Sequence, residues 1–557
     1  MQNRIESVRS LHDQIFDLCV IGGGATGAGC ALDAQLRGLR TALIDAGDYA
    51  SATSSASTKL AHGGVRYLEQ ALREFDLGQF RVVRSAQRER ARMLHNAPHL
   101  AHSREFLILC FSRWETLYYG IGVRLYDWLS GSENLAPSHV LDRDQTVERF
   151  SQLSTAGMAG SVLYTDGQFD DARYVLALIE SFAEAGGTAG NYLKLISFER
   201  NTAGKLTEAV IEDRRSKEKL LVRARAFVNA TGPFSDGVRA LAHPDAASRL
   251  VLSRGVHILL PLSSPSDSVA LLIPHTEDGR VIFAIPWLGR LLVGTTDQEV
   301  SDNSEFAVTR EEAEFLIRHL NRYVRRPRSV SEIVSAFSGV RPLVRAAHAQ
   351  QTKRLIRDHE VEVDQHSGLV SVLGGKWTTY RAMAEDSINH VQHSLGQRVT
   401  QSRSANYPLA GAPGFSQRYA GELSARHGIS LDQAQHLTQK FGTAADEVCV
   451  IAQREPALRR RVADGFPAIE AEIAYSIRCE MAMSIEDVLA RRLGFQFFSW
   501  SLAVQAAPKV AQHFVREHGW SEAERAAAVN DYTNNIRRMQ RALGPEPATG
   551  IPRASAE

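Results

Sequence analysis

The first structural signal in the chain is the run Phe16-Asp17-Leu18-Cys19-Val20-Ile21-Gly22-Gly23-Gly24-Ala25-Thr26-Gly27. Its first half is a short, mostly apolar segment that stops at glycines, which is typical of a buried strand. Gly22, Gly24 and Gly27 have the GxGxxG spacing, and the small residues that follow them are compatible with a helix. The sequence therefore predicts a strand, a tight glycine turn and a helix that begins at the turn.

A second predicted strand, Thr41-Ala42-Leu43-Ile44-Asp45, ends in an acid, and this Asp45 lies 18 residues after Gly27. In a dinucleotide-binding unit Gly22 permits the tight turn, Gly24 lets the backbone approach a pyrophosphate, and Gly27 lets helix and strand pack closely. The helix N-terminus offers N–H donors to phosphate, and Asp45 can accept hydrogen bonds from a ribose. The pattern predicts a Rossmann-type domain and leaves NAD and FAD open.

The length of the chain, 557 residues, predicts two or three domains. Another strand-like run, 226–230, lies far from the first, so we expect an α/β Rossmann-type domain in separate pieces. An α+β substrate domain with an antiparallel sheet would be inserted between them, and helical patterns dominate after a Pro- and Gly-containing linker at 408–414. The predicted boundaries are 17–85, 175–240 and 335–400 for the cofactor domain, 86–174 and 241–334 for the substrate domain, 415–543 for a helical domain and 544–557 for a disordered tail.

Composition argues against several classes of protein. A net charge of +1 gives no bulk attraction to nucleic acid. The five cysteines have neither paired nor metal-like spacing, which favours a reducing compartment and no metal site. Residues 1–16 lack the apolar core of a secretory signal, and no apolar run is long enough to cross a bilayer. We expect a cytoplasmic protein whose contact with a membrane would be peripheral.

Further blocks of sequence carry a family resemblance. The most specific is Ala52-Thr53-Ser54-Ser55-Ala56-Ser57-Thr58-Lys59-Leu60-Ala61-His62-Gly63-Gly64-Val65-Arg66-Tyr67-Leu68-Glu69. It is followed in order by Asp170-Asp171-Ala172-Arg173, Asn229-Ala230-Thr231-Gly232-Pro233, Gly294-Thr295-Thr296-Asp297, Phe337-Ser338-Gly339-Val340-Arg341-Pro342-Leu343, Gly374-Gly375-Lys376-Trp377-Thr378-Thr379-Tyr380-Arg381 and Asp487-Val488-Leu489-Ala490-Arg491-Arg492. Together they resemble the FAD-dependent, aerobic-type glycerol-3-phosphate dehydrogenase family. The chain departs from that pattern at Asp45, Ala56 and Val65, where the family usually has Glu, Arg and Leu.

The resemblance implies oxidation of sn-glycerol 3-phosphate to dihydroxyacetone phosphate, with hydride transfer to N5 of FAD. Arg66, Arg341 and Lys376 are the expected anion pocket, and one of these cations, such as Lys376, would instead serve the reduced flavin. His62 is the first candidate for the general base and His257 the second, while Tyr67 would orient the substrate or simply pack. The expected cofactor contacts, besides the glycine turn and Asp45, are Thr53, Ser54, Ser55, Ser57, Thr231, Gly232, Gly375 and Thr379.

The resemblance also implies a peripheral enzyme on the cytoplasmic face of a bacterial-type inner membrane, with the quinone pool as electron acceptor. Two sequence features are compatible with this: Arg81, Arg84, Arg88 and Arg92 share one helix face, and 114–129 contains Trp114, Tyr118, Tyr119, Tyr126 and Trp128. A solvated arginine stripe and a buried aromatic core are the competing interpretations. No nucleic-acid partner is expected, and a homodimer is compatible with the sequence.

Three alternatives stay open at this stage. The first is an oxidase of the same family that reduces oxygen, although the chain shows no obvious insertion of the kind such relatives tend to carry. The second is a dehydrogenase of another polyol phosphate, such as erythritol phosphate, because the same anion pocket would bind it. The third is a flavin-binding scaffold without turnover, which the presence of Arg66, Arg341 and Lys376 argues against.

Overall fold

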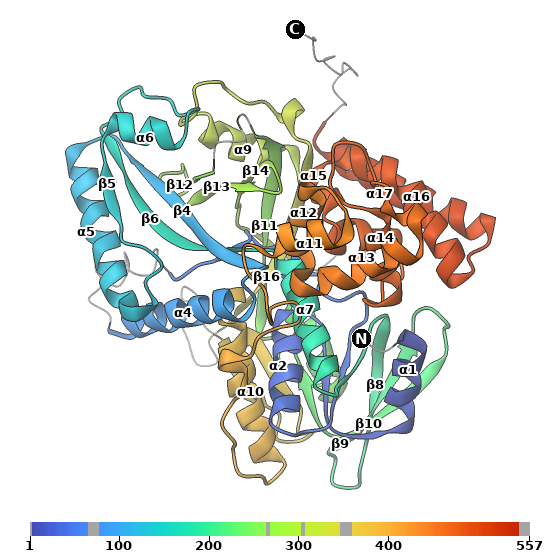
Figure 1. Cartoon of the computed structure of the whole chain (residues 1–557). Helices are drawn as coiled ribbons and strands as arrows, with labels where there is room; N and C mark the ends of the chain where they lie inside the picture. Colours follow the sequence, from blue (N-terminus) through green and yellow to red (C-terminus); the bar gives the residue numbers. More distant parts are fainter. Residues whose placement is uncertain are drawn as a thin grey trace.

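The computed structural model describes residues 3–64, 77–262, 264, 268–301, 307–345 and 359–544. This part of the chain forms two β-sheets and a C-terminal group of helices (Figure 1). The predicted α/β architecture with a C-terminal helical region is therefore confirmed. The predicted disordered tail lies outside the described residues from 545 onward.

The first sheet contains the predicted strand, turn, helix and strand. Its strands follow the order β17-β18-β10-β1-β2-β7, and β9 joins β8 to β10. The parallel partners are β1 with β2 and β10, β2 with β7, and β10 with β18, so the carboxyl ends of these strands meet at one edge. The strands are β1 (Ile15–Ile21), β2 (Thr41–Ile44), β7 (Thr188–Gly190), β8 (Leu193–Arg200), β9 (Leu206–Asp213), β10 (Lys219–Asn229), β17 (His359–Val363) and β18 (Val370–Gly374).

Both faces of the central strand β1 are covered. Leu18 and Val20 join a core that includes residues of α2 (Ala25–Leu36), α7 (Asp171–Glu184) and α10 (Tyr380–Ser394). Cys19 and Ile21 point into a second core with residues of α1 (Arg4–Asp13), α8 (Ser235–Ala242) and the β8–β9 hairpin. Burial on both faces explains why this strand is mostly apolar rather than alternating.

The second sheet is mostly antiparallel and follows the order β15-β11-β14-β13-β12-β4-β6-β3, with β16 beside β11 and β5 beside β6. The structure differs from the predicted boundary at 335, because β16 pairs with β11 along its whole length. The strands are β3 (Leu60–Ala61), β4 (Ala101–Cys110), β5 (His139–Leu141), β6 (Gly160–Phe169), β11 (Leu250–Pro261), β12 (Ala270–Ile273), β13 (Ile282–Trp287), β14 (Arg290–Gly294), β15 (Gln298–Val300) and β16 (Ser335–Val344). The helices of this region are α4 (Leu77–Asn96), α5 (Arg113–Ser130), α6 (Arg143–Arg149) and α9 (Arg310–Leu320).

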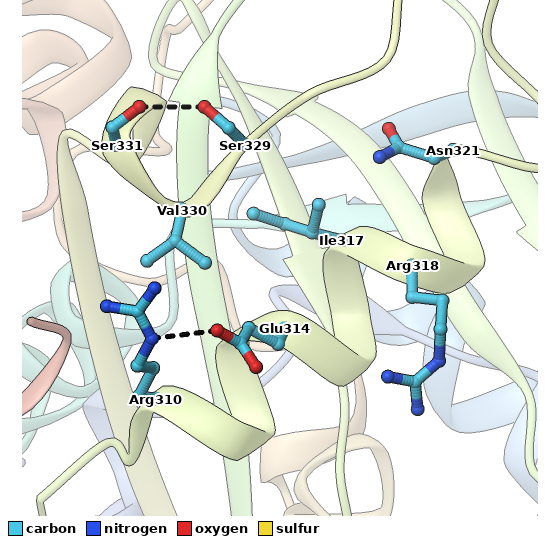
Figure 2. A pocket seen from close by; sticks show the side chains of 8 residues that line it. All are labelled: Arg310, Glu314, Ile317, Arg318, Asn321, Ser329, Val330 and Ser331. Carbon is cyan, nitrogen blue, oxygen red and sulfur yellow. Dashed lines mark hydrogen bonds and ion pairs between the residues drawn. The ribbon is translucent and has the colours of Figure 1, made fainter.

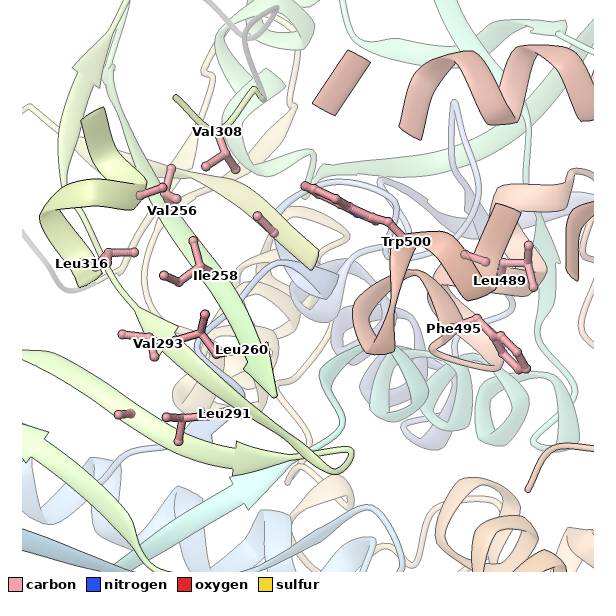
Figure 3. Packing of buried hydrophobic residues seen from close by; sticks show 14 of the residues in the cluster. Val256, Ile258, Leu260, Leu291, Val293, Val308, Leu316, Leu489, Phe495 and Trp500 are labelled. Atoms are coloured by element: carbon pink, nitrogen blue, oxygen red, sulfur yellow. The ribbon is translucent and has the colours of Figure 1, made fainter. Parts of the chain in front are cut away.

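The C-terminal helices pack on the second sheet. Val256 and Ile258 of β11 belong to the same apolar core as Leu489, Phe495 and Trp500 (Figure 3). This shared core fixes the C-terminal helices to the remainder of the molecule. The helical elements are α11 (Tyr419–His427), α12 (Leu431–Phe441), α13 (Ala445–Arg454), α14 (Glu470–Arg478), the π-helix η9 (Asp487–Arg492), α15 (Phe495–Phe498), α16 (Trp500–His518) and α17 (Glu522–Ala542).

Candidate active site

The glycine turn at the carboxyl end of β1 leaves no room for side chains. Gly22 has φ +109°, and a Cβ at this position would lie 2.6 Å from the carbonyl oxygen of Ala230. A Cβ on Gly27 would overlap the carbonyl oxygen of Gly22, and one on Gly24 would lie 2.8 Å from Ser54 Oγ. Because α2 begins directly after Gly24, the N–H groups of its first turn lie beside the glycine turn.

Asp45 lies at the end of β2, beside the same turn. Its carboxylate accepts hydrogen bonds from the backbone N–H of Gly23 at 2.6 Å and of Gly47 at 2.7 Å. Burial raises the pKa of Asp45 to about 6, although both N–H donors oppose that shift. The carboxylate therefore links the glycine turn to the loop after β2, and it titrates close to the physiological range.

The loop that carries Thr53 and Ser54 joins three parts of the site. The Thr53 hydroxyl donates to the carbonyl oxygen of Val340 on β16 at 2.6 Å. The Ser54 hydroxyl accepts a hydrogen bond from the N–H of Ala25 at 2.9 Å. The backbone carbonyl oxygen of Ser54 accepts one from Trp377 Nε1 at 2.9 Å. These side chains, predicted as cofactor contacts, position the loop between the start of α2, β16 and the segment after β18.

A buried ion pair that sequence reasoning missed lies beneath this loop. Lys59 Nζ donates to Asp171 Oδ1 at 2.6 Å and to the carbonyl oxygen of Ser55 at 2.7 Å. The other carboxylate oxygen of Asp171 accepts from the hydroxyl of Ser57 at 2.7 Å. The ammonium group lies 4.8 to 5.0 Å from three aromatic ring centres, those of Trp287, Phe337 and Phe497. The pair holds the loop through its bonds to Ser55 and Ser57. Each charge needs the other, because an unpaired buried charge would destabilise the fold.

The segments after β10 and β18 reach the same edge of the first sheet. The hydroxyl of Thr231 donates to Asn229 Oδ1 at 2.7 Å, and Gly232 has φ +56°. After β18, Gly375 has φ +86°, and Lys376 accepts a hydrogen bond from the Thr379 hydroxyl at 3.2 Å through its carbonyl oxygen. Both turns lie at the carboxyl ends of parallel strands, where a nucleotide cofactor binds in doubly wound sheets.

His62 is the predicted base, and it stands beside a buried carboxylate. Its Nδ1 lies 3.3 Å from Asp166 Oδ2 and 2.8 Å from the backbone N–H of Gly64, so the two contacts compete for this nitrogen. A proton on Nδ1 would face Asp166 and leave Nε2 to accept a proton. The backbone N–H of His62 donates to Thr378 Oγ1 at 3.1 Å, which joins it to the segment after Lys376.

Asp166 on β6 is a second residue that sequence reasoning missed. Its Oδ1 accepts from Arg90 Nη1 at 2.9 Å, and the hydroxyl of Tyr126 lies 3.3 Å from Oδ2. Burial opposes ionisation, but the attraction of Arg90 and His62 outweighs it, so the pKa of Asp166 lies below its usual range. An ionised carboxylate at this position stabilises a protonated His62.

His257, the second candidate for the base, lies on β11 among buried groups. Its Nε2 is 2.9 Å from Thr58 Oγ1, and its ring stacks on Phe337 with ring centres 4.9 Å apart. Burial, together with the charges of Arg341 and Lys59, holds the pKa of His257 well below its usual range. His257 is therefore neutral near pH 7.

Arg341 extends from β16 across the backbone of Gly255. Its Nη2 donates to Thr295 Oγ1 at 2.9 Å, and its Nη1 donates to the carbonyl oxygen of Thr296 at 3.3 Å. Asp297 Oδ1 lies 3.7 Å from Nη1, and 36% of the Arg341 side chain is exposed. These contacts hold the planar guanidinium in one orientation while part of it faces outward, which suits bidentate binding of an anion.

Hydrogen bonds bring most of the predicted site residues together around the loop 53–64. The glycine turn, β16 and the segment after β18 all contact this loop. Arg66, predicted for the anion pocket, and Tyr67, predicted to orient the substrate or simply pack, lie outside the described residues. A separate depression lies between α9 and Ser329–Ser331, where Arg310 pairs with Glu314 (Figure 2). None of the predicted site residues line it, so we place the chemistry at the loop.

Comparison with known proteins identifies relatives over most of the chain. Residues 17–381 match the family model described as FAD dependent oxidoreductase, and residues 402–525 match the model for the C-terminal domain of alpha-glycerophosphate oxidase. The mitochondrial glycerol-3-phosphate dehydrogenase of Homo sapiens is 38% identical over 91% of this chain and 71% of its own length. The mitochondrial glycerol-3-phosphate dehydrogenase of Arabidopsis thaliana is 36% identical over 91% of this chain and 84% of its own.

A solved structure extends the agreement to the whole fold. The glycerol-3-phosphate dehydrogenase of Bacillus halodurans, solved with FAD, is 29% identical, covers 98% of this chain and 99% of its own, and superimposes with a TM-score of 0.79. The predicted cofactor, FAD, is thereby confirmed, and the glycine turn and Asp45 fit a dinucleotide. The chain belongs to the family of FAD-dependent glycerol-3-phosphate dehydrogenases.

Proposed function

We propose that the protein oxidises sn-glycerol 3-phosphate to dihydroxyacetone phosphate and passes the electrons to a membrane quinone. The observation that carries the proposal is sequence similarity: over 91% of its length, the chain is 36 to 38% identical to proteins named glycerol-3-phosphate dehydrogenase. Loop 53–64 contains His62, and its Thr53 bonds to Val340, the neighbour of Arg341; this supports the proposal, because the reaction needs a base and an anion-binding cation.

Each proposed role follows from the chemistry of the substrate. His62 takes the proton of the C2 hydroxyl, and Asp166 holds the imidazole and balances its positive charge. Arg341 binds the phosphate through its planar fork, with Arg66 and Lys376 as the other cations of the pocket. Tyr67 orients the substrate.

The cofactor is held by the edge of the first sheet. Bound FAD supplies the acceptor for the hydride that leaves C2. We propose that the first turn of α2 binds its pyrophosphate and that Asp45 accepts hydrogen bonds from its ribose. The remaining contacts are proposed for the turns and loops at this edge, namely Gly22, Gly24, Gly27, Thr53, Ser54, Ser55, Ser57, Thr231, Gly232, Gly375 and Thr379.

The affinity for FAD is expected to fall at acidic pH because of Asp45. Hydrogen bonds from a ribose favour the carboxylate form, so protonation of a group with a pKa of about 6 competes with FAD binding. Affinity should be greatest above that pH and about tenfold lower one unit below it. Titration of the apoprotein with FAD at several pH values measures this. Asp45→Asn should bind FAD more weakly, and its affinity should no longer depend on pH in this range. If the affinity of the variant fell at acidic pH as that of the wild type does, another group would be responsible.

The membrane proposal rests on the outer face of α5. Five large apolar side chains are half or more exposed there: Trp114 80%, Leu117 53%, Tyr118 51%, Ile121 57% and Trp128 75%. Their spacing places them on one side of the helix, opposite a buried side that includes Val123 and Tyr126. An exposed apolar face of this kind is typical of a helix that lies in a lipid interface.

Two of the sequence expectations for this surface need correction. Tyr126, predicted among the interface aromatics, is only 1% exposed, because it turns inward to Arg90 and Asp166. The predicted basic face of α4 is smaller than expected, since Arg92 pairs with Glu89 at 2.5 Å, while Arg84 and Arg88 are exposed. The Arg81 side chain lies outside the described residues.

We place the protein at the cytoplasmic face of a bacterial-type inner membrane, attached by α5, with quinone as acceptor. Among the described residues, no helix has the length and apolar character needed to cross a membrane. The match of residues 402–525 to a model named for an oxidase keeps oxygen as the alternative acceptor. Erythritol phosphate and similar polyol phosphates are the alternative substrates.

Binding to vesicles and reoxidation by quinone test both proposals together. The double variant Trp114→Ser/Trp128→Ser should bind anionic phospholipid vesicles at least about tenfold more weakly, because each indole buries apolar surface in the interface. Its reduced flavin should be reoxidised more slowly by a quinone embedded in those vesicles, with no change for a water-soluble quinone. Leu431→Ser, at a 54% exposed apolar residue on α12, is the matched control. Equal vesicle binding by all three proteins would contradict attachment through α5, and rapid reoxidation in air would favour the oxidase.

A further inference from the structure

A cluster of buried charges connects the C-terminal helices to the loop after β2. Its members are Asp48 in that loop and Asp487, Arg491 and Arg492 of the π-helix η9, and we call it the Asp48 cluster. Both arginine side chains are at most 5% exposed, and that of Asp48 is fully buried. Charges so far from water need close partners, because desolvation of an unpaired charge costs several kcal/mol.

The carboxylate of Asp48 is surrounded by donors from both sides. Arg491 Nε and Arg492 Nη1 each donate to Oδ2 at 2.7 Å, and Arg492 Nη2 donates to Oδ1 at 3.0 Å. Asn191, which follows β7, adds a fourth donor to Oδ1 at 3.2 Å. Burial alone would raise the pKa of Asp48, but Arg492 and Arg491 outweigh it and lower that pKa to about 2. Asp48 is therefore ionised under all ordinary conditions.

The two arginines are fixed in turn by the C-terminal segment. Arg491 Nη2 donates to Asp487 Oδ1 at 2.5 Å, and Arg492 donates to the carbonyl oxygens of Asp487 at 3.0 Å and of Glu480 at 2.6 Å. The arginine pair is thus anchored before it reaches Asp48. A rigid donor set of this kind fixes the position of its acceptor more than it adds net stability.

The loop that Asp48 belongs to also carries the proposed ribose acceptor. Asp45 accepts from the N–H of Gly23 and Gly47, and the N–H of Ala50 donates to the carbonyl oxygen of Gly23 at 3.1 Å. Tyr49 packs beneath Gly23, and its hydroxyl lies 3.5 Å from Met481 Sδ. Loop 45–50 is therefore held by the glycine turn on one side and by the C-terminal segment on the other.

We propose that the C-terminal helical segment completes the FAD site, with Arg491 and Arg492 as positioning residues that hold loop 45–50 through Asp48. The proposal rests on the proposed placement of the FAD ribose at Asp45, and it is independent of the substrate. The C-terminal helices thereby gain a role in retaining the cofactor. Loss of the cluster should release the adenosine half of FAD even though its residues do not reach the flavin chemistry.

The test compares FAD binding by variants of the purified full chain, stripped of FAD and titrated with it. Arg492→Met should raise the dissociation constant of FAD at least about tenfold, and that of ADP, which carries only the adenosine half, by a similar factor. Arg492→Lys, which retains the charge, should recover part of the affinity. Lys440→Met is the matched control, because it removes another buried ion pair of the C-terminal helices, Lys440 Nζ to Asp170 Oδ2 at 2.7 Å, whose partner begins α7. It should change the FAD dissociation constant less than about twofold.

Two further variants separate the possible failures. If Arg492→Met does not fold, Arg491→Met and the double variant Asp48→Asn/Arg492→Met take its place, since the first leaves Asp48 one arginine and the second removes one charge of each sign. FAD and ADP constants within twofold of wild type in these variants, with the melting temperature of the apoprotein lowered as in Lys440→Met, would overturn the proposal. If the cluster variants and Asp45→Asn all leave FAD affinity unchanged, the ribose placement itself is wrong. If Asp45→Asn weakens FAD binding and the cluster variants do not, only the role of the Asp48 cluster is rejected.

Discussion

Replacing His62 with alanine is expected to slow reduction of the flavin by sn-glycerol 3-phosphate by about 10²- to 10⁴-fold, the contribution typical of a positioned general base. The imidazole is partly exposed toward the site, and the ionised carboxylate of Asp166 lies 3.3 Å from its Nδ1. That carboxylate stabilises the imidazolium formed when the C2 hydroxyl loses its proton. Anaerobic stopped-flow measurement of flavin absorbance gives the rate at saturating substrate. Substrate affinity should change much less, because the proposed phosphate contacts remain.

His390→Ala is the matched control for this prediction. His390 is a partly exposed histidine on α10 whose Nδ1 lies 3.7 Å from Asp386 Oδ1, so it shares the pairing of His62 but lies outside the proposed site. It should leave flavin reduction unchanged. A His62→Ala protein that is reduced as fast as wild type would remove His62 as the base and direct attention to His257, whose Nε2 contacts Thr58.

Replacing Arg341 with alanine is expected to lower kcat/KM for sn-glycerol 3-phosphate by about 10²- to 10³-fold, as for other preorganised groups that stabilise charge. The guanidinium is oriented by Thr295 Oγ1 and the carbonyl oxygen of Thr296, and a planar fork binds a phosphate through two parallel hydrogen bonds. Arg341→Lys keeps the charge but loses the fork, so its loss should be intermediate. Steady-state kinetics with a soluble acceptor provides the measurement.

Arg318→Ala provides the comparison for Arg341. Arg318 is an exposed arginine on α9 that pairs with Glu277 at 3.1 Å, and it contributes to the depression outside the proposed site. Its kinetics should match wild type within about twofold, since exposed ion pairs contribute little. Arg341 would be excluded from the anion pocket if its alanine variant kept both kcat and KM within the same range.

The features that sequence predicts well here are those fixed by local geometry. Gly22 and Gly27 have roles set by backbone conformation and close packing, so their spacing predicted the turn, and the structure has it. The helical pattern expected after the 408–414 linker is present in the C-terminal helices, of which α17 is the longest, because apolar and charged residues follow a helical period there. The family and its FAD cofactor were likewise predictable from ordered motifs, and the comparisons confirm them.

The features that sequence missed depend on contacts between distant residues. Asp48 and Arg492 are 444 positions apart, and Lys59 and Asp171 are 112 apart, so no local period or spacing relates them. For Tyr126 the sequence left a membrane-interface aromatic and a buried core residue as alternatives, and only the packing of α5 shows that it faces inward. Motif reading selected His62 without Asp166, because the partner of a base is defined by the fold rather than by its neighbours in sequence.

Anaerobic mixing of the FAD-loaded protein with sn-glycerol 3-phosphate tests the proposed activity most directly. The oxidised flavin absorbance should bleach on addition of this compound, dihydroxyacetone phosphate should form in equal amount, and glycerol, which lacks the phosphate that Arg341 is proposed to bind, should bleach it far more slowly. Addition of a quinone analogue should restore the absorbance, whereas air should do so slowly. The account would be contradicted if sn-glycerol 3-phosphate left the flavin oxidised while erythritol phosphate bleached it. It would also be contradicted if none of the polyol phosphates bleached the flavin.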